Sequence, residues 1–543
     1  VKNEDQTKGN YNNDGATGDN ALAAGVDASA TANGTTAVGL KAQASAESAI
    51  AVGSETKAAA KNAVVIGNKA SVEAATGSVA NVNGTTTGEG SVAVGAASKA
   101  SGTNATAVGQ AANAFGQNSF AGGQNSKASG KSSVAIGDGA NATDDSSSAV
   151  GPYAQATKSG ASAFGYYANA LGENSLAAGR NAQATNANAV ALGNESKATG
   201  QNTIAFGNNA NASQNQAMAL GRNTVASAGY TVALGDEAKA TAIKAIAFGS
   251  SAQATGTNSV ATGVQAKAHA DDALAVGSNA NASGESAIAL GKQSNAWKVN
   301  SLAFGNSANS NGERAIAIGL ESVSNGQNAV SVGQKAYADE HGVAIGSESN
   351  AAQAAAIAIG NKAQAMKYSS IVIGEEAKSN NSRSVVIGYH ASATNPAMSA
   401  SNQDTNQTVA IGAYANAWGD QSTAIGNNVD AKGNSSIAIG ADDWDTVAVK
   451  TVAGMGKTVK QVYQDYTGDV METGSYTHTT SSEAAVAIGT KSQAIGELST
   501  AFGTGTIAEG VASAAFGMGA KATKGNSVAI GAGSTTTTGA TSV

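Results

Sequence analysis

The chain has 543 residues, and its 31 Lys and Arg residues against 38 Asp and Glu residues give a formal net charge of −7. Charged residues make up 13% and aromatic residues 4%, which excludes the composition of an ordinary enzyme domain. The acidic balance gives nucleic acid no basic surface to bind, and the absence of Cys excludes disulfides and thiolate chemistry. No stretch of about 18 apolar residues is present, so we expect no membrane contact within this segment.

Residues 1–20 form an N-terminal segment, and from residue 21 onward a short phrase ending in Gly recurs. It reads SAIAVG at 48–53, SVAIG at 133–137, SAIALG at 286–291 and SVAIG at 527–531. Its glycines fall every 14 residues from Gly95 to Gly333 without a break. Such a fixed period predicts a stack of equivalent repeats rather than several globular domains.

Four departures from the period mark insertions and deletions. Gly67 and Gly95 lie two periods apart, with Asn81 where a glycine is expected, which indicates one degenerate repeat. One residue is missing near His341, and extra residues predict a short insertion at 389–407. The gap between Gly440 and Gly489 predicts an inserted subdomain or projecting loop at 441–485, between repeats at 21–440 and C-terminal repeats at 486–543.

Within one repeat, positions are numbered from the phrase glycine as zero. Branched or large apolar residues occupy −3 and −1, Ala occupies −2 in nearly every copy, and small residues return at +3 and +5. Both segments alternate with period two, which is typical of strands. The glycine and the polar residues at +1, +2 and +7 to +9 suit turns. Each repeat therefore predicts one coil of an all-β, parallel β-solenoid with 14 residues per coil.

The apolar residues at −3 and −1 point to the opposite face from the inward Ala at −2. A monomer would expose them as a stripe larger than the apolar patch that a soluble monomer usually tolerates. Burial of each −3/−1 pair is worth roughly 2–4 kcal/mol per coil, so we expect parallel self-association. The predicted core of the assembly includes Ile50, Val52, Val134, Ile136, Ile204, Phe206, Ile316, Ile318, Ile357, Ile359, Ile437 and Ile439.

The phrase Ser-Val-Ala-Ile-Gly followed by Ala-x-Ala resembles the YadA-like head repeats of trimeric autotransporter adhesins of Gram-negative bacteria. The resemblance implies a left-handed β-roll and a parallel homotrimer with the apolar strand faces in the middle. It also implies a head or passenger segment at the cell surface, anchored in the outer membrane in the full-length protein. The expected function is adhesion, including biofilm formation or coaggregation, in which a rigid trimeric spacer binds a matrix protein, a glycan or another cell-surface ligand by multivalent contacts.

Aromatic residues that interrupt the small and polar pattern are the candidate ligand contacts, because aromatics favour binding hot spots. Tyr337, Trp297 and Trp418 lie in the repeats, and Trp444, Tyr463, Tyr466 and Tyr476 lie in the 441–485 insert. Within the insert, the spacing of Val459, Val462, Tyr463 and Tyr466 predicts a short amphipathic helix, and the alternation over 446–452 predicts a strand.

Catalysis, cofactor binding and metal binding are not expected. The four histidines are far apart, and Gly454–Thr458 (GMGKT) lacks the first glycine of a phosphate-binding loop, because position 451 is Thr. The alternative functions are a purely structural solenoid, an ice- or surface-binding solenoid, and a phage-fibre-like protein without a host receptor.

Overall fold

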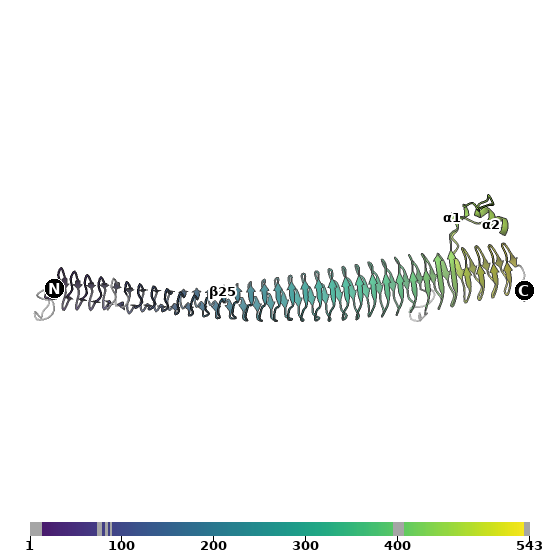
Figure 1. The fold of residues 1–543 in the computed structure, drawn as a ribbon. Coiled ribbons are helices and arrows are strands. Elements are labelled where there is room, and N and C mark those ends of the chain that lie inside the picture. The colour runs from purple at the N-terminus through teal and green to yellow at the C-terminus, as the bar shows by residue number, and fades with distance from the viewer. Residues whose placement is uncertain (1–13, 73–78, 82–84, 87–88, 395–406, 537–543) are drawn as a thin grey trace. The chain divides into compact units, whose positions relative to one another are not determined.

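The computed structural model describes residues 14–72, 79–81, 85–86, 89–394 and 407–536. It confirms the predicted all-β parallel solenoid and divides the chain into two compact units, residues 1–266 and 267–543. In both units the odd-numbered strands cover positions −3 to −1 of the repeat, and the even-numbered strands cover +4 and +5. Each pair of an odd and an even strand makes one coil (Figure 1).

In the first unit, the odd strands run from β1 (Leu22–Ala24) through β25 (Val190–Leu192) to β35 (Val260–Thr262), and the even strands from β2 (Ser29–Ala30) to β34 (Gln253–Ala254). Each strand pairs in parallel with its counterpart in the next coil. Thus β27 (Ile204–Phe206) pairs with β29 (Met218–Leu220) in the register Ile204↔Met218. Likewise, β28 (Asn211–Ala212) pairs with β30 (Val225–Ala226).

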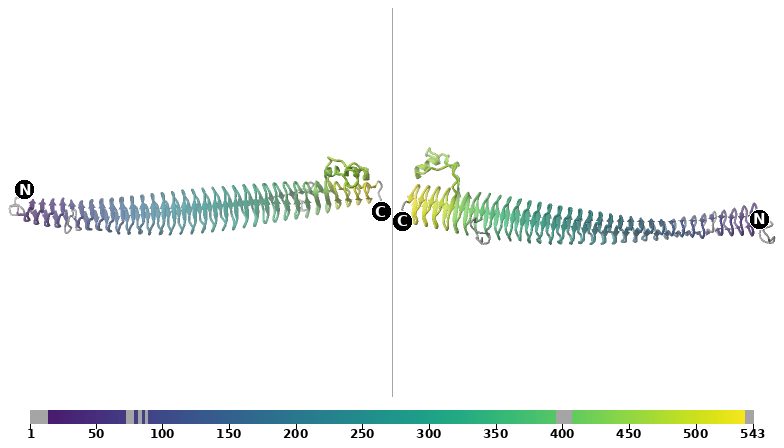
Figure 2. Two further views of the ribbon diagram at one scale, coloured as in Figure 1. Left: turned by 45° about the horizontal axis from the view of Figure 1, so that its top comes forward. Right: turned by 180° about the vertical axis from the view of Figure 1, so that it is seen from behind.

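In the second unit, the even strands run from β36 (Lys267–Ala268) to β68 (Thr535–Thr536), and the odd strands from β37 (Leu274–Val276) to β67 (Val528–Ile530). Two odd strands are longer than the rest, β57 (Thr423–Asn427) and β59 (Ile437–Ala441). The helices α1 (Asp445–Ala448) and α2 (Val459–Thr467) follow β59. All three views place them beside the last coils of this unit (Figures 1 and 2).

The interior of each coil is built from small side chains, as the alternation predicts. In β27 and β28, Ala205 and Ala212 are fully buried, whereas Ile204 is half-buried and Phe206 is 54% exposed. Buried hydroxyls at +3 bond back to the turn, and Ser126 Oγ donates to the Gly123 carbonyl at 2.9 Å. Small residues at −4, −2, +3 and +5 therefore let the two sheets of a coil approach closely.

The turns depend on two kinds of left-handed residue. At position zero, Gly207 has φ 137°, and a Cβ there would lie 2.3 Å from the Gly221 carbonyl oxygen of the next coil, so only glycine fits. At +2 and +9, non-glycine residues adopt φ near 55°, as Lys41 and Ser48 do in the first unit. These two positions therefore accept varied side chains at a modest conformational cost.

The irregular repeats keep the parallel pairing of strands between successive coils. β9 (Val79–Asn81) pairs with β7 (Val64–Ile66) in the register Ile66↔Asn81, so Asn81 occupies position −1 and not the glycine position that the spacing predicts. The prediction was wrong because an extra residue precedes β9 and one fewer follows it.

Near His341, the missing residue shortens the turn before β47 (Val343–Ile345), and the pairing Val330↔Val343 is kept. The insertion predicted at 389–407 falls mostly outside the described residues, yet Val385↔Val409 pairing continues across it.

The large insertion is shorter in the structure than 441–485. Thr479–Ser481 forms β60, which pairs with β58 (Val429–Ala431), so the chain re-enters the coil at Thr479. Residues 442–478 are called the insert from here on. The helix predicted around Val459 is confirmed as α2, whose capping box joins Thr458 and Gln461.

The strand predicted over 446–452 is wrong. α1 occupies the start of that segment, and Thr451 makes only an isolated bridge to Thr458. Strands elsewhere in the chain are stabilised by an identical strand one coil away, and this segment has no such neighbour.

Candidate ligand site at the insert

A small core of its own holds the insert together. Trp444, Ala448, Tyr463 and Met471 are buried against one another, and the Trp444 and Tyr463 rings lie 5.6 Å apart. The Trp444 indole Nε1 donates to the Glu472 carbonyl at 2.6 Å. Trp444 and Tyr463, which the sequence suggests as ligand contacts, are therefore also the structural anchors of this subdomain.

Polar contacts fix the two ends of the insert to the solenoid. The buried Asp442 carboxylate accepts hydrogen bonds from the Asn427 and Asn428 side chains at 3.2 and 2.5 Å. At the other end, His478 Nδ1 lies 2.9 Å from Asp430 Oδ2. Thr479 Oγ1 donates to the Ala441 and Gly489 carbonyls. The insert therefore leaves and rejoins the stack at one level.

Three glycines make room for α2 on the following coils. Gly505, Gly519 and Gly533 occupy +2, where φ is near 65° and other coils carry residues such as Lys335 or Lys362. A Cβ on Gly505 would lie 2.6 Å from the Tyr463 hydroxyl, and one on Gly519 would lie 2.7 Å from Thr467 Cγ2. The glycines are thus explained by the docked helix. Sequence reasoning missed this contact, although three successive +2 glycines after the insert were a readable signal.

Two lysines tie the insert to the same coils. Lys521 Nζ lies 2.7 Å from Asp469 Oδ2. Lys491 is only 5% exposed, and its ammonium sits 4.2 Å from the centre of the Trp444 ring and donates to the Ser475 carbonyl. Burial lowers the pKa of Lys491, and the nearby carboxylates of Asp445, Asp442, Asp443 and Glu472 oppose this shift.

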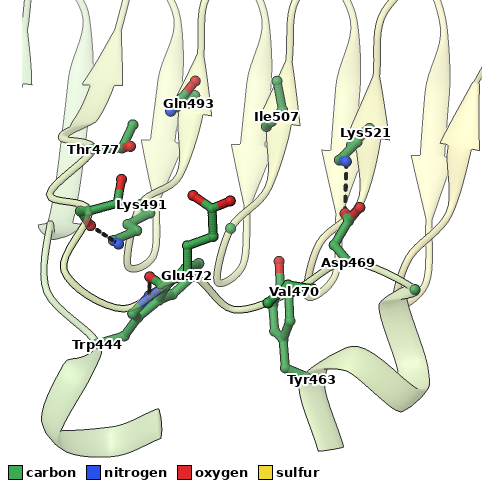
Figure 3. A pocket seen from close by; sticks show the side chains of 13 residues that line it. Trp444, Tyr463, Asp469, Val470, Glu472, Thr477, Lys491, Gln493, Ile507 and Lys521 are labelled. Carbon is green, nitrogen blue, oxygen red and sulfur yellow. Dashed lines mark hydrogen bonds and ion pairs between the residues drawn. The ribbon is translucent and has the colours of Figure 1, made fainter. Parts of the chain in front are cut away.

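A chamber of about 600 Å³ lies between the insert and the even strands (Figure 3). Its floor is formed by the outward +4 residues Gln493, Ile507 and Lys521, together with Lys491 and Gly505. Its walls and roof come from Trp444, Tyr463, Gly468, Asp469, Val470, Glu472, Ser475 and Thr477. The chamber therefore combines an aromatic wall with hydroxyl, amide, carboxylate and ammonium groups.

The exposed tyrosines of the insert lie in other places. Tyr466 lines a hollow of about 260 Å³ with Val462 and Asp465 of α2 and with Met455 and Lys457 from the segment before it. Tyr476 lines a hollow of about 350 Å³ at the base of the insert, with Asn427, Asn428, Asp442, Asp443 and His478. The structure thus distributes the four aromatic candidates of the insert over three surfaces.

The remaining aromatic candidates lie on separate coils. Trp297 at +6 is exposed, and Trp418 at +6 is half-buried with the Lys432 ammonium 5.7 Å from its ring centre. Tyr337 at +4 is half-buried, and burial raises its pKa. Among the described residues, no aromatic ring contact joins these three side chains to one another or to the insert.

Two aromatic clusters at the +1 and +2 turns were not predicted from the sequence. In the first unit, Tyr153 stacks on Tyr167 with ring centres 4.9 Å apart, and Tyr166 packs edge-on against both. In the second unit, His390 stacks on Tyr414, and Tyr389 packs edge-on against both. Aromatic residues at +2 of consecutive coils would have identified both pairs.

The residues predicted to form the core of an assembly all lie on the outer face of the odd strands. None of the twelve is buried in the single chain, and they range from half-buried to exposed.

The family model for the YadA head domain repeat, two copies long, matches most of the chain. The matched residues are 16–42, 44–70, 87–110, 100–126, 128–154, 145–168, 156–182, 170–196, 198–224, 226–252, 254–280, 268–294, 282–308, 296–322, 310–336, 340–363, 367–391, 406–428, 481–506 and 508–534. The chain belongs to the YadA head family. Its repeats are those of a YadA-like head of a trimeric autotransporter adhesin, which supports an adhesin-like role.

The insert lies outside every matched stretch of the YadA head repeat, between 428 and 481. A search of curated proteins found no match. Across the described residues, no group of His, Asp or Glu side chains is arranged to hold a metal ion. No helix in the same residues has the length and apolar character needed to cross a membrane. YadA heads and the solenoid fold point to a structural protein rather than an enzyme.

Proposed function

We propose that this YadA-like head works as a parallel homotrimer on the bacterial surface, as a rigid spacer that binds extracellular ligands. The observation that carries the proposal is the row of mostly apolar side chains at −3 and −1 on the outer face of the odd strands in each unit. Members of the row such as Phe206 and Phe304 are more than half exposed within their own chain. Apolar rows of this length are stabilised when identical chains bury them against one another.

Side-chain volumes along the row support packing against a fixed neighbour. In β15 (Phe120–Gly122), Phe120 at −3 is followed by Gly122 at −1, and a Cβ on Gly122 would lie 2.8 Å from the Phe120 ring. The opposite order occurs in β65 (Ala514–Phe516), where Ala514 precedes Phe516. In these two coils a large residue is therefore paired with a small one, as close packing against a neighbour favours.

The insert supports the same assignment because it leaves the row open. It covers the +2 and +4 positions of the last coils, whereas Phe502 and Ile530 on the adjoining odd strands remain exposed, Ile530 by 69%. A subdomain that was merely shielding apolar surface would cover these residues first. The row is thus available to neighbouring copies even where the chain carries its own covering element.

Ligand binding is assigned to the surfaces that remain outside such an assembly. The +4 side chains of the even strands repeat from coil to coil, so many weak contacts with an extended matrix protein or glycan would add by avidity. The aromatic residues of the insert supply a more specific contact, because they stand on a rigid scaffold. In the full-length protein we place this head outside the outer membrane.

The assembly is tested by introducing charge into the row. Asp at −1 in four successive coils, in place of Ile345, Ile359, Ile373 and Ile387, is expected to shift the protein from trimer toward monomer in sedimentation velocity. The matched control places Asp at +4 of the same coils, in place of Asn350, Gln364, Lys378 and Ser392, and should remain a trimer. Equal behaviour of the two variants would contradict the proposed interface. A trimer that binds no matrix protein or glycan would leave only the spacer role.

A further inference from the structure

The chamber between the insert and the even strands contains polar groups that the fold leaves without partners. Tyr463 is 4% exposed, and no described residue makes a hydrogen bond to its hydroxyl, which lines the chamber (Figure 3). The ring is buried against Trp444, and the hydroxyl at the chamber wall is free to bond with a group that enters the chamber.

Three further side chains line the same space without a hydrogen bond to any described residue. They are the exposed Glu472 and Thr477 from the roof and the half-buried Gln493 from the floor. In Figure 3 the Glu472 carboxylate points toward the strands that carry Gln493. Together with Tyr463, they offer two O–H donors, an amide that both donates and accepts, and a carboxylate with two acceptor oxygens.

The charges in the chamber favour a neutral ligand. Lys521 is paired with Asp469 at 2.7 Å, and Lys491 is held by the Trp444 ring and the Ser475 carbonyl. Both ammonium groups are thus already engaged, and the Glu472 carboxylate makes no hydrogen bond or close ion pair with a described residue. An anionic ligand would meet this carboxylate without a free cation to balance it.

We propose that this chamber binds a neutral sugar residue of a glycan. A carboxylate can accept hydrogen bonds from two neighbouring hydroxyls of one sugar ring, and an amide and hydroxyls at fixed positions complete such a contact. Ile507 on the floor offers an apolar surface to the C–H face of the ring. The volume of about 600 Å³ falls in the range of pockets that bind small molecules.

This inference rests on the proposed adhesin function and makes it more specific, because it names the ligand class of one site. The site requires both the repeats and the insert, and the insert lies outside the matched YadA head repeats. The sugar can belong to a host glycan or to a bacterial polysaccharide, since both present the same hydroxyl chemistry.

The test is an array of neutral, acidic and amino-sugar glycans, from host and bacterial sources, probed with the full chain. Bound glycans are then titrated by ligand-observed NMR. Glu472→Gln is expected to weaken binding of a neutral glycan roughly ten- to hundredfold, and Tyr463→Phe roughly three- to tenfold, as expected for lost hydrogen bonds to charged and neutral groups. Tyr463→Phe keeps the ring that packs against Trp444, so it preserves the fold of the insert.

A third variant, Gln493→Ala, removes the amide from the chamber floor. Its matched control is Gln364→Ala, which removes the same side chain at +4 of a coil that lies away from the insert. Binding should fall for Gln493→Ala and stay unchanged for Gln364→Ala. Selective binding of acidic glycans, unchanged binding by the Glu472 and Tyr463 variants, or no binding to any glycan would each overturn the proposal. Sedimentation of the same sample separates the two proposals, because an intact trimer without glycan binding contradicts only the sugar site.

Discussion

The coils beneath the insert and the coils before it in the second unit share the same interior but differ on the outside. At +5, Ala494 and Ala508 are fully buried, as are Ala351 and Ala365 in coils that the insert does not reach. At +2, in contrast, Gly505 and Gly519 replace the Glu348 and Lys362 of the earlier coils. The interior is thus set by the coil itself, whereas the outer positions adapt to what covers them.

The row at −3 and −1 does not follow this rule. It remains mostly apolar in both sets of coils, as in β49 (Ile357–Ile359) and β61 (Val486–Ile488), although the insert covers it in neither. Because outer positions adapt to what covers them, an outer row that keeps its apolar character indicates a cover that is common to the coils of both sets. Neighbouring copies of the chain provide such a cover.

The largest expected effect comes from the glycine at position zero. Gly360→Ala places a Cβ 2.4 Å from the Gly374 carbonyl oxygen at φ 132°, so we expect a loss of about 3 kcal/mol or more in the stability of the surrounding coils. Lys362→Ala at +2 of the same coil is the control, and its effect should stay within about 0.5 kcal/mol. Hydrogen exchange of residues 343–388 measures both, and equal protection would contradict the assigned roles.

A large residue in the inner column should have the next largest effect. Ala358→Leu adds three carbons between two sheets packed around alanine, which we expect to cost about 1–3 kcal/mol. Ile359→Leu, one residue along on the outer face, keeps the side-chain volume and should be nearly neutral. Chemical denaturation followed by circular dichroism compares the stability of the two variants. A larger loss of stability from the outer substitution would contradict the assignment of Ala358 to the inner face and Ile359 to the outer face.

Release of the insert is the third prediction. Gly519→Lys restores the residue type that +2 carries in other coils, but its side chain would occupy the space of Thr467 and Tyr463. We expect faster hydrogen exchange and faster proteolysis at 459–467, with no change in the coils. As a control, Ser307→Lys introduces the same side chain at +2 of an uncovered coil. If it exposed the insert equally, docking on the glycines would be disproved.

A smaller, pH-dependent effect is expected from Lys491. Burial lowers its pKa below the usual 10.5, so the docked insert holds this proton less tightly than the undocked one does. Docking should therefore strengthen as the pH rises from the lowered pKa toward about 10.5. Hydrogen-exchange protection of residues 459–467, measured as a function of pH, reports this change. The slope of protection against pH should be smaller in the Lys491→Met variant. A curve that kept its slope in Lys491→Met would assign the effect to another group.

The sequence allowed prediction of the features that repeat, because each coil meets an almost identical neighbour. The period, the two strands, the buried Ala at −2 and the outward row at −1 all follow from alternation. Asn81 was misplaced because a compensating insertion and deletion leave the spacing of the flanking glycines unchanged. Residues 479–481 were assigned to the insert because the insert separates them from Gly440, so no phrase glycine stands three residues before Thr479.

The insert was harder to predict because its contacts are unique. The helix around Tyr463 has a local capping box and a periodic apolar face, so it could be predicted. Apolar and polar residues alternate over 446–452 as they do in a strand, but no neighbouring strand pairs with this segment. The chamber depends on Gln493 and Glu472, which are far apart in sequence and meet only because the insert folds back over the later coils.

The most direct test of the outward row uses the absence of cysteine in the chain. Ile318→Cys at −1 introduces one thiol per copy, and so does Asn309→Cys at +4. With a short bis-maleimide, we expect covalent dimers for the Ile318 variant, because copies meet at this row, and no cross-link for the Asn309 variant. Cross-linking of the Asn309 variant alone, or of neither variant, would contradict the claim that sister chains bury the apolar row.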